Sequence, residues 1–182
     1  MPNVTLEMLF DRLGTRGTGA YGLADVNQLE HALQSAALAA AEKRGDGFTI
    51  AALFHDVGHL VADADVDLAA QGIDDRHEEA SADVLLPIFG PEIAEPVRLH
   101  VASKRYLCTV EPDYYGKLSV DSVQSLELQG GLMSEDEVRD FEALPGFEHG
   151  VALRRIDDAA KVPGLAVPPL EAYRPVAQRV LI

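Results

Sequence analysis

The sequence predicts an all-α fold, because three observations agree. Apolar residues recur at helical spacing in most segments, for example at Val26, Leu29 and Leu33. No segment has the apolar and polar alternation of a half-buried strand. Glycine, proline and capping residues divide the chain into pieces of helix length. We therefore expect a helical bundle that forms a single domain over residues 1–182.

The expected helices are separated by glycine, proline or polar segments. They span residues 4–12, 25–44, 48–60, 76–89, 92–107, 119–131 and 147–162, with one more that begins at Ser134. Asp25 is the candidate cap of the second helix, and Gly45 and Gly47 are expected to end it. Pro96 predicts a break or kink, because proline cannot donate a helical hydrogen bond. The proline-rich C-terminal tail is expected to wrap over the surface.

Composition excludes several classes of protein. Thirty acidic against fifteen basic side chains give a net charge of −15, which opposes binding of nucleic acid through a broad basic face. Cys108 is the single cysteine, so an internal disulfide and a cysteine-based zinc site are excluded. No apolar run is long enough to span a membrane, and the N-terminus lacks the pattern of a signal peptide. We expect a cytoplasmic protein in which a local cationic pocket can still bind a small anion.

The stretch AALFHDVGHL, residues 51–60, is the strongest functional signal. An apolar run that belongs in a core ends in His55 and Asp56 and then, one helical turn on, in His59. On a continuous helix the two histidines share a face and Asp56 starts on its edge, so all three can reach one pocket. The alternative is a surface pair that caps a helix end. Anchoring in the core favours a metal site, since a metal ligand has to be held still.

Histidines in other segments decide between these interpretations. His31, His77 and His100 each fall on a separate expected helix, whereas His149 lies at a helix start and looks unconnected. One core histidine is usually satisfied by a backbone carbonyl, but several helices that each direct an imidazole inward are typical of metal sites in bundles. Asp56 can bridge two cations. Together with a late aspartate, these residues predict a dinuclear site, whose nitrogen and oxygen ligands suit iron, manganese or zinc.

Six blocks of sequence, spread over nearly the whole chain, resemble those of one protein family. They are QLEHALQSA, LFHDVGH, RHEEASADVL, LHVASKRYL, SVQSLELQGG and ALRRIDDAAK. The family is the HD-domain superfamily, and the similarity is closest to its oxygenase branch, the PhnZ-like phosphonate-degrading enzymes related to myo-inositol oxygenase. The resemblance implies an HD-domain helical bundle that holds two iron ions as an Fe(II)/Fe(III) pair and uses O₂ as co-substrate.

The resemblance also implies a role for each metal-binding residue. Asp157 rather than Asp158 is matched, because it lies four residues before Lys161, as the family's ligand does before its lysine. The implied ligands are His31, His55 and Asp157 for one iron, His77 and His100 for the other, and Asp56 as the bridge between them.

A second group of residues is implied to handle the substrate. The phosphonate would be positioned by His59, Lys104, Ser122 and Arg154. Lys104 and Arg154 lie one turn from His100 and Asp157 on the same expected helices, which agrees with a cationic pocket beside the metals. In a glycine-rich loop, Tyr21 matches a tyrosine that closes off one iron before substrate arrives. Three residues later, Ala24 stands where the family's best-known member has a glutamate that recognises a substrate amine, with Asp25 beside it.

By this resemblance the chain is expected to use O₂ to cleave the carbon–phosphorus bond of a small anionic 1-hydroxyphosphonate, releasing phosphate and a carboxylic acid. One alternative is an HD phosphohydrolase, in which the same ligands hold metals that activate water against a phosphate ester. Another is a metal-stabilised regulatory or scaffold module without activity. Dependence of phosphate release on O₂ separates the two enzymes. Because Ala24 replaces the amine-recognising glutamate, small substrates such as hydroxymethylphosphonate are expected.

Overall fold

The described part of the chain folds into helices joined by turns and loops. The computed structural model describes residues 4–19, 26–61 and 75–182, and every regular element in these ranges is helical, as predicted. The α-helices are α1 (Leu6–Arg16), α2 (Gln28–Ala41), α3 (Asp46–Phe54), α4 (Gly58–Val61), α5 (His77–Phe89), α6 (Pro91–Val110), α7 (Val120–Leu128), α8 (Glu135–Glu142), α9 (Phe147–Ala159) and α10 (Arg174–Arg179). The described residues also form the 3₁₀ helices η2 (Tyr115–Lys117) and η3 (Leu170–Tyr173).

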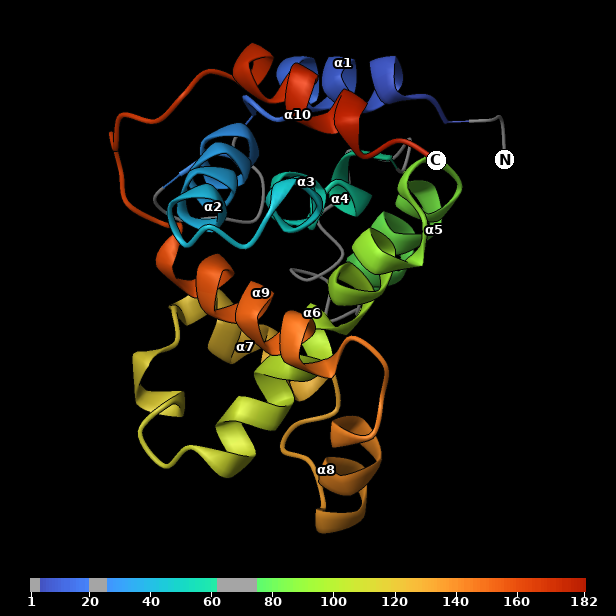
Figure 1. Ribbon diagram of the computed structural model, residues 1–182. Helices are drawn as coiled ribbons and strands as arrows, with labels where there is room; N and C mark the ends of the chain where they lie inside the picture. The colour runs from blue at the N-terminus through green and yellow to red at the C-terminus, as the bar shows by residue number, and fades with distance from the viewer. Residues whose placement is uncertain (1–3, 20–25, 62–74) are drawn as a thin grey trace.

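Helix α3 lies at the centre of the core. It contacts α2, α6, α9 and α10, and all of its residues from Phe48 to Phe54 are buried. Figure 1 shows the pair α1 and α10 on one side of α3, with α9 and α6 on the other. The Phe54 ring packs against Phe10 at a centroid distance of 5.4 Å and against Phe89 at 6.4 Å. These aromatic contacts fix the end of α3, directly before the histidines of the motif.

The helix expected over residues 48–60 is interrupted, so its second half was predicted wrongly. Helix α3 ends before His55, and α4 begins at Gly58. The residues between them form tight turns, whose hydrogen bonds join residues three apart instead of four. An added Cβ at Gly58 would lie 2.1 Å from the carbonyl oxygen of His77, so the chain passes too close to α5 for a larger residue. His55 and His59 therefore do not share one helical face.

The two N-terminal helices also differ from expectation at their ends. Helix α1 continues beyond its expected end to Arg16, because Leu13 extends its buried apolar stripe. Helix α2 is capped by Asn27, whose side chain accepts a hydrogen bond from the backbone nitrogen of Glu30 at 2.8 Å in a capping box. The candidate cap Asp25 lies outside the described residues.

The structure corrects three further expectations, two of them only in part. Gly47 does not end a helix but lies in the first turn of α3. Helix α6 does not break at Pro96, whose ring nitrogen cannot donate to the carbonyl of the exposed Glu92. The tail does more than wrap the surface, because η3 and α10 bury Tyr173 and Ala177 against the core. The C-terminal segment is thus part of the packed fold.

The later helices begin where the sequence predicts. Ser119 caps α7, and Ser134 forms a capping box with Glu137 at the start of α8. Helix α9 begins at Phe147 and packs along α6. Gly150 of α9 lies close to Leu99 and Ser103 of α6, and this close packing brings polar residues of the two helices to the same part of the interior.

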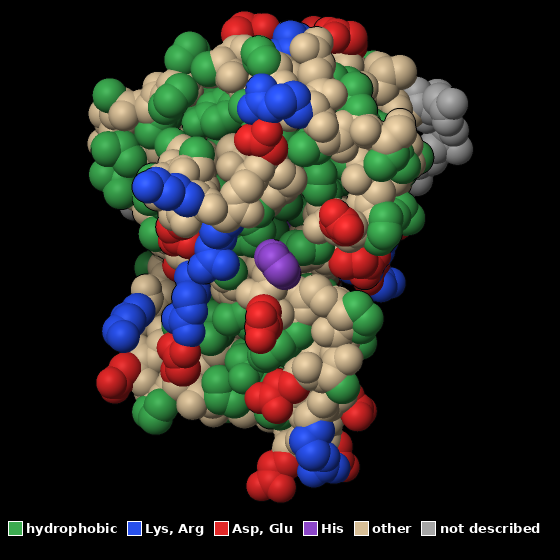
Figure 2. Space-filling view, in the orientation of Figure 1, with side chains coloured by type: hydrophobic (Ala, Val, Ile, Leu, Met, Phe, Trp, Pro, Cys, Tyr) green, Lys and Arg blue, Asp and Glu red, His purple; other side chains and the backbone are tan. Residues whose placement is uncertain are grey.

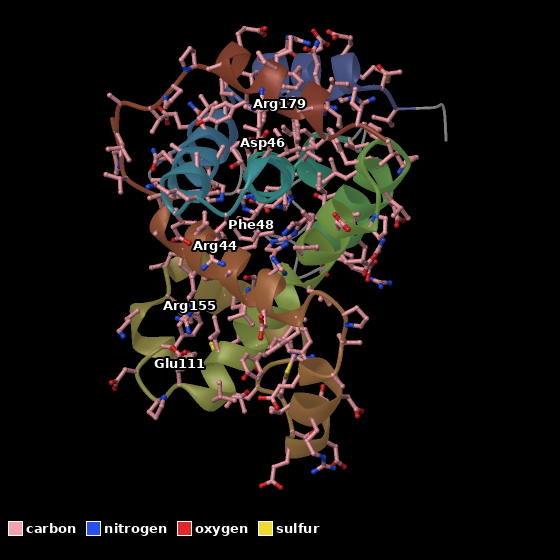
Figure 3. The ribbon with its side chains drawn as sticks, in the orientation of Figure 1. Arg44, Asp46, Phe48, Glu111, Arg155 and Arg179 are labelled. Carbon is pink, nitrogen blue, oxygen red and sulfur yellow. The ribbon has the colours of Figure 1, made fainter. Side chains whose placement is uncertain are left out.

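Charged side chains on the surface join helices that are distant in sequence. Arg179 of α10 pairs with Asp46 of α3 at 2.7 Å, and Arg155 of α9 pairs with Glu111 after α6 (Figure 3). Exposed pairs of this kind contribute little, so core packing holds the helices together. Figure 2 shows acidic and basic side chains interspersed over one face rather than gathered by sign. Within the described ranges, no helix has the length and apolar character needed to cross a membrane.

Candidate metal centre

Side chains from five segments meet in the interior. They are His31 of α2, His55 and Asp56 after α3, His77 at the start of α5, His100 of α6 and Asp157 of α9. Burying this many polar groups is costly unless each finds a partner. The six residues predicted as metal ligands therefore form one cluster, and their contacts can be followed in two halves.

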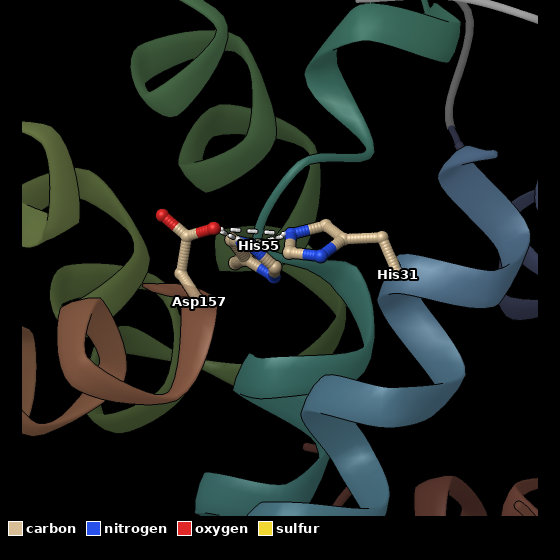
Figure 4. A group of neighbouring side chains, drawn as sticks. All are labelled: His31, His55 and Asp157. Atoms are coloured by element: carbon tan, nitrogen blue, oxygen red, sulfur yellow. Dashed lines mark hydrogen bonds and ion pairs between the residues drawn. The ribbon is translucent and has the colours of Figure 1, made fainter. Parts of the chain in front are cut away.

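His31, His55 and Asp157 form one half (Figure 4). The Nε2 atoms of the two histidines lie 3.1 Å apart, and Oδ1 of Asp157 lies 3.1 Å from the first and 3.8 Å from the second. Ligand atoms held about 2.1 Å from one metal are about 3.0–3.4 Å apart at octahedral or tetrahedral angles. The spacing of these three side chains is therefore close to that of ligands around one cation.

His77, His100 and Asp56 form the other half. The Nε2 atoms of the two histidines lie 3.3 Å apart, and each is 3.5 Å from Oδ1 of Asp56. The second oxygen of Asp56, Oδ2, lies 3.5 Å from Nε2 of His31 in the first half. Asp56 therefore contacts both halves, which is the position that a bridging carboxylate requires.

Backbone carbonyls orient three of the histidines. Nδ1 of His31 donates to the carbonyl oxygen of Ala160 at 2.9 Å. Nδ1 of His55 donates to that of Ala52 at 2.9 Å, and Nδ1 of His100 donates to that of Val97 at 2.7 Å. A carbonyl oxygen can only accept, so each Nδ1 carries a hydrogen, and Nε2 is the ring nitrogen that faces the centre. Partners of this kind are usual for histidines that bind metals.

The fit to a cation follows from this orientation. Nε2 of His31 and Nε2 of His55 face each other across 3.1 Å, and two nitrogen lone pairs at this distance repel each other until a cation or proton lies between them. A metal ion satisfies both lone pairs at once. The donor set of imidazole nitrogens and carboxylate oxygens, without a thiolate, suits iron, manganese or zinc.

Asp75 is a site residue that the sequence analysis missed. Its carboxylate accepts a hydrogen bond from Nδ1 of His77 at 3.0 Å and pairs with His59, whose Nδ1 lies 2.7 Å from Oδ2. Burial opposes ionisation of Asp75, but its contacts with these two histidines prevail and lower its pKa. In the sequence it ends an acidic run that resembles solvated surface. The signal that could have found it is a carboxylate two residues before a candidate ligand histidine.

His59 lies beside His77 rather than beside the first half of the cluster. The two rings stack with centroids 4.0 Å apart and an interplanar angle of 22°. Burial, followed by the charge of His59, lowers the pKa of His77 to about 4, so His77 is neutral at pH 7, as a metal ligand must be. His59 thus contacts Asp75 and His77 and lies within reach of Asp56.

Lys104, Ser122 and Arg154, here called the donor cluster, lie on the Asp157 side. Arg154 Nη1 pairs with Oδ2 of Asp157 at 2.6 Å, and Arg154 Nη2 donates to Ser122 Oγ at 3.1 Å. Lys104 is buried, and its Nζ donates to Ser125 Oγ at 2.6 Å. Burial, followed by the positive charge of Arg154, lowers the pKa of Lys104 to about 7. Buried donors and positive charge therefore adjoin the metal centre.

Of the two adjacent aspartates, Asp157 joins the histidines. Asp158 instead pairs with Arg154 and accepts a hydrogen bond from the hydroxyl of Tyr114. Lys161 Nζ lies 3.2 Å from Oδ1 of Asp157. Burial opposes ionisation of Asp157, but the charges of Arg154 and Lys161 hold its pKa well below the usual value. Asp157 is therefore a carboxylate at neutral pH.

Three residues considered in the sequence analysis remain. Tyr21 and Ala24 fall outside the described residues. His149 is exposed on α9, and its ring lies 5.9 Å from that of Phe48 between centroids, in keeping with its lack of connection to the other histidines.

Comparison with known proteins gives relatives over almost the full length. The family model described as HD domain matches residues 29–129. A hydroxymethylphosphonate dioxygenase of Gimesia maris is 44% identical over 173 residues, covering 94% of this chain and 86% of that protein. A 1-hydroxy-2-(trimethylamino)ethylphosphonate dioxygenase of Leisingera caerulea, described as glycine-betaine-forming, is 38% identical, covering 95% and 87%. An uncharacterized protein of Acanthamoeba polyphaga mimivirus is 36% identical over 150 residues, covering 81% and 68%.

Proposed function

The chain belongs to the HD-domain family, and we propose that it is an O₂-dependent oxygenase that cleaves the carbon–phosphorus bond of a small 1-hydroxyphosphonate. The products are inorganic phosphate and a carboxylic acid. The proposal is carried by the 44% and 38% identity, over 94% and 95% of the chain, with two proteins named as hydroxyphosphonate dioxygenases. The donor cluster supports it, because a phosphonate dianion needs cationic hydrogen-bond donors.

The metal centre is proposed to hold two iron ions as an Fe(II)/Fe(III) pair. His31, His55 and Asp157 would bind one ion and His77 and His100 the other, while Asp56 is shared. The repulsive contact of 3.1 Å between two Nε2 acceptors and the absence of thiolate donors support this assignment. When bound, iron supplies the redox chemistry with O₂ that no amino-acid side chain in the site provides.

The donor cluster is proposed to bind and orient the phosphonate. Among the described residues, Lys104 gives one of its three N–H donors to Ser125, which leaves two for phosphonate oxygens. Ser122 and Arg154 add a hydroxyl and a guanidinium. Both are buried, and water screens buried charges only weakly, so the attraction of Arg154 for a dianion stays strong. His59 is proposed as the fourth partner of the phosphonate. Lys104 and His59 thereby also have a catalytic role, because they hold the reacting carbon beside the metal centre.

Two further roles rest on the sequence alone. Tyr21 is proposed to close off one iron until substrate binds. Ala24 replaces the glutamate that the family resemblance assigns to recognition of a substrate amine, so no carboxylate is available at this position to pair with a quaternary ammonium group. We therefore propose hydroxymethylphosphonate, which has no amine, as the substrate, with formate and phosphate as products.

The test is phosphate release from hydroxymethylphosphonate by iron-loaded protein, in air and without O₂. The expected result is release only with O₂, with one O₂ consumed and one formate formed for each phosphate. Equal release without O₂ would identify a hydrolase. The trimethylamino substrate, assayed in parallel, is expected to have a lower kcat/KM, because its cation meets no carboxylate at position 24.

A further inference from the structure

Arg154 uses most of its hydrogen-bonding capacity on the protein itself. A guanidinium has five N–H donors. Among the described residues, Nε donates to the Tyr114 hydroxyl at 3.2 Å, Nη1 pairs with Asp157 at 2.6 Å, and Nη2 reaches both Ser122 Oγ at 3.1 Å and Asp158. These contacts occupy four of the donors, so the orientation of the guanidinium is fixed before any substrate binds.

Tyr114 and Asp158 close a ring of three side chains with Arg154. The Tyr114 hydroxyl accepts from Arg154 Nε and donates to one oxygen of Asp158, while the other oxygen of Asp158 accepts from Arg154 Nη2. Tyr114 is buried and comes from the segment after α6, whereas Arg154 and Asp158 lie on α9. The ring therefore ties the guanidinium to a second part of the chain and restricts its rotation.

We propose that Tyr114 and Asp158 are positioning residues that hold Arg154 in the orientation that binds the phosphonate. The inference rests on the proposed function, in which Arg154 contacts the substrate. Neither Tyr114 nor Asp158 needs to touch the substrate. They prevent rotation of the guanidinium, whose Nη atoms already contact Asp157 and Ser122. Binding of the phosphonate dianion therefore costs little conformational entropy in Arg154.

The variants Tyr114→Phe and Asp158→Ala test this role in the iron-loaded enzyme. Each is expected to raise KM for hydroxymethylphosphonate about tenfold or more, the size of a lost hydrogen bond to a charged group, while kcat changes less than about threefold. Inorganic phosphate gives a readout without turnover. The phosphate concentration that half-maximally raises the thermal unfolding temperature should increase by a similar factor, with unchanged iron content. The control Tyr115→Phe alters a neighbouring tyrosine that is 49% exposed, and it should change neither quantity.

The two variants also distinguish positioning from charge. Removing the negative charge of Asp158 would by itself strengthen attraction of a dianion to Arg154, so a lower KM in Asp158→Ala would overturn the proposal. An unchanged KM and phosphate response in Tyr114→Phe would overturn it as well. If the wild-type protein turns over no hydroxyphosphonate, the proposed function fails, and the phosphate-dependent unfolding temperatures still decide whether Tyr114 and Asp158 position an anion-binding arginine.

Discussion

The two sides of the metal centre are anchored in different ways. The half formed by His31, His55 and Asp157 is here called the sealed side, and the half with His77 and His100 the open side. On the sealed side, both histidines are 0% exposed and donate to backbone carbonyls. On the open side, His77 is 12% exposed and donates to the side chain of Asp75. A carbonyl is held by the helix that carries it, whereas a carboxylate depends on its own rotamer. The fold itself therefore preorganises both histidines of the sealed side. On the open side, His100 also donates to a carbonyl, but His77 depends on one acidic residue.

Asp56 contacts both sides, so its removal tests whether they form one centre. Asp56→Ala is expected to lower bound iron from about two ions per chain to a small fraction of one, and turnover by about a thousandfold or more, because both ions lose their shared ligand. Elemental analysis and phosphate release measure the two effects. Retention of both irons with full phosphate release would show that Asp56 is not a shared ligand.

Asp75→Ala tests the open side alone. The loss of a carboxylate behind a ligand histidine costs about 10–100-fold in metal affinity or activity, so turnover should fall by up to about a hundredfold. The sealed side should keep its ion, which leaves about one iron per chain. Asp83→Ala, which removes a carboxylate that is 64% exposed on α5, is the matched control. Equal loss of iron from both sides would contradict separate anchoring.

The sequence predicts the candidate metal ligands of this centre better than the groups that orient them. His31, His77 and His100 lie on expected helices, where periodicity alone indicates which residues face the interior. The break after α3 could not be predicted, because it depends on the close approach of Gly58 to the carbonyl of His77, which only the folded chain brings about. The same approach separates the two histidines of the motif, which sequence spacing placed on one face.

The groups that orient these side chains could not be predicted from the sequence either. A carbonyl acceptor such as Ala160 O carries no mark in the sequence, since every residue has one. Asp75 and Asp158 do carry a mark, but acidic residues are frequent in this chain, and only tertiary contacts distinguish these two from solvated ones. The ring formed by Tyr114, Asp158 and Arg154 therefore became visible only in the structure.

In the donor cluster, the pKa of Lys104 predicts how KM depends on pH. Because burial and Arg154 lower the pKa of Lys104 to about 7, the free enzyme loses this proton as the pH rises through neutrality. A dianion favours the protonated amine, so binding above that pH takes up a proton, and KM should rise by up to about tenfold per pH unit. Lys104→Met should raise KM about thirtyfold at pH 6 and abolish this slope, with iron content unchanged.

The matched control for Lys104 is Lys117→Met, which removes an exposed lysine in η2. Its KM should match that of the wild type at every pH. A slope that persists in Lys104→Met would show that another group titrates on substrate binding.

Gln34 gives the smallest expected effect and concerns the backbone of the sealed side. Its buried amide donates to Val162 O at 2.8 Å and accepts from Val162 N at 3.0 Å, two residues beyond the carbonyl that orients His31. Gln34→Leu leaves both backbone groups without this partner, which costs about 2 kcal/mol and lowers the unfolding temperature by about 4–8 °C. The exposed Gln178→Leu should leave the unfolding temperature unchanged. No difference between the two variants would show that Gln34 does not brace the sealed side.

The most direct measurement is anomalous diffraction at the iron absorption edge from crystals of the iron-loaded protein. We expect two peaks about 3.5–4 Å apart, with the carboxylate of Asp56 between them. One peak should lie among His31, His55 and Asp157, and the other beside His77 and His100. A single peak, or two peaks that do not share Asp56, would contradict a dinuclear centre bridged by this residue.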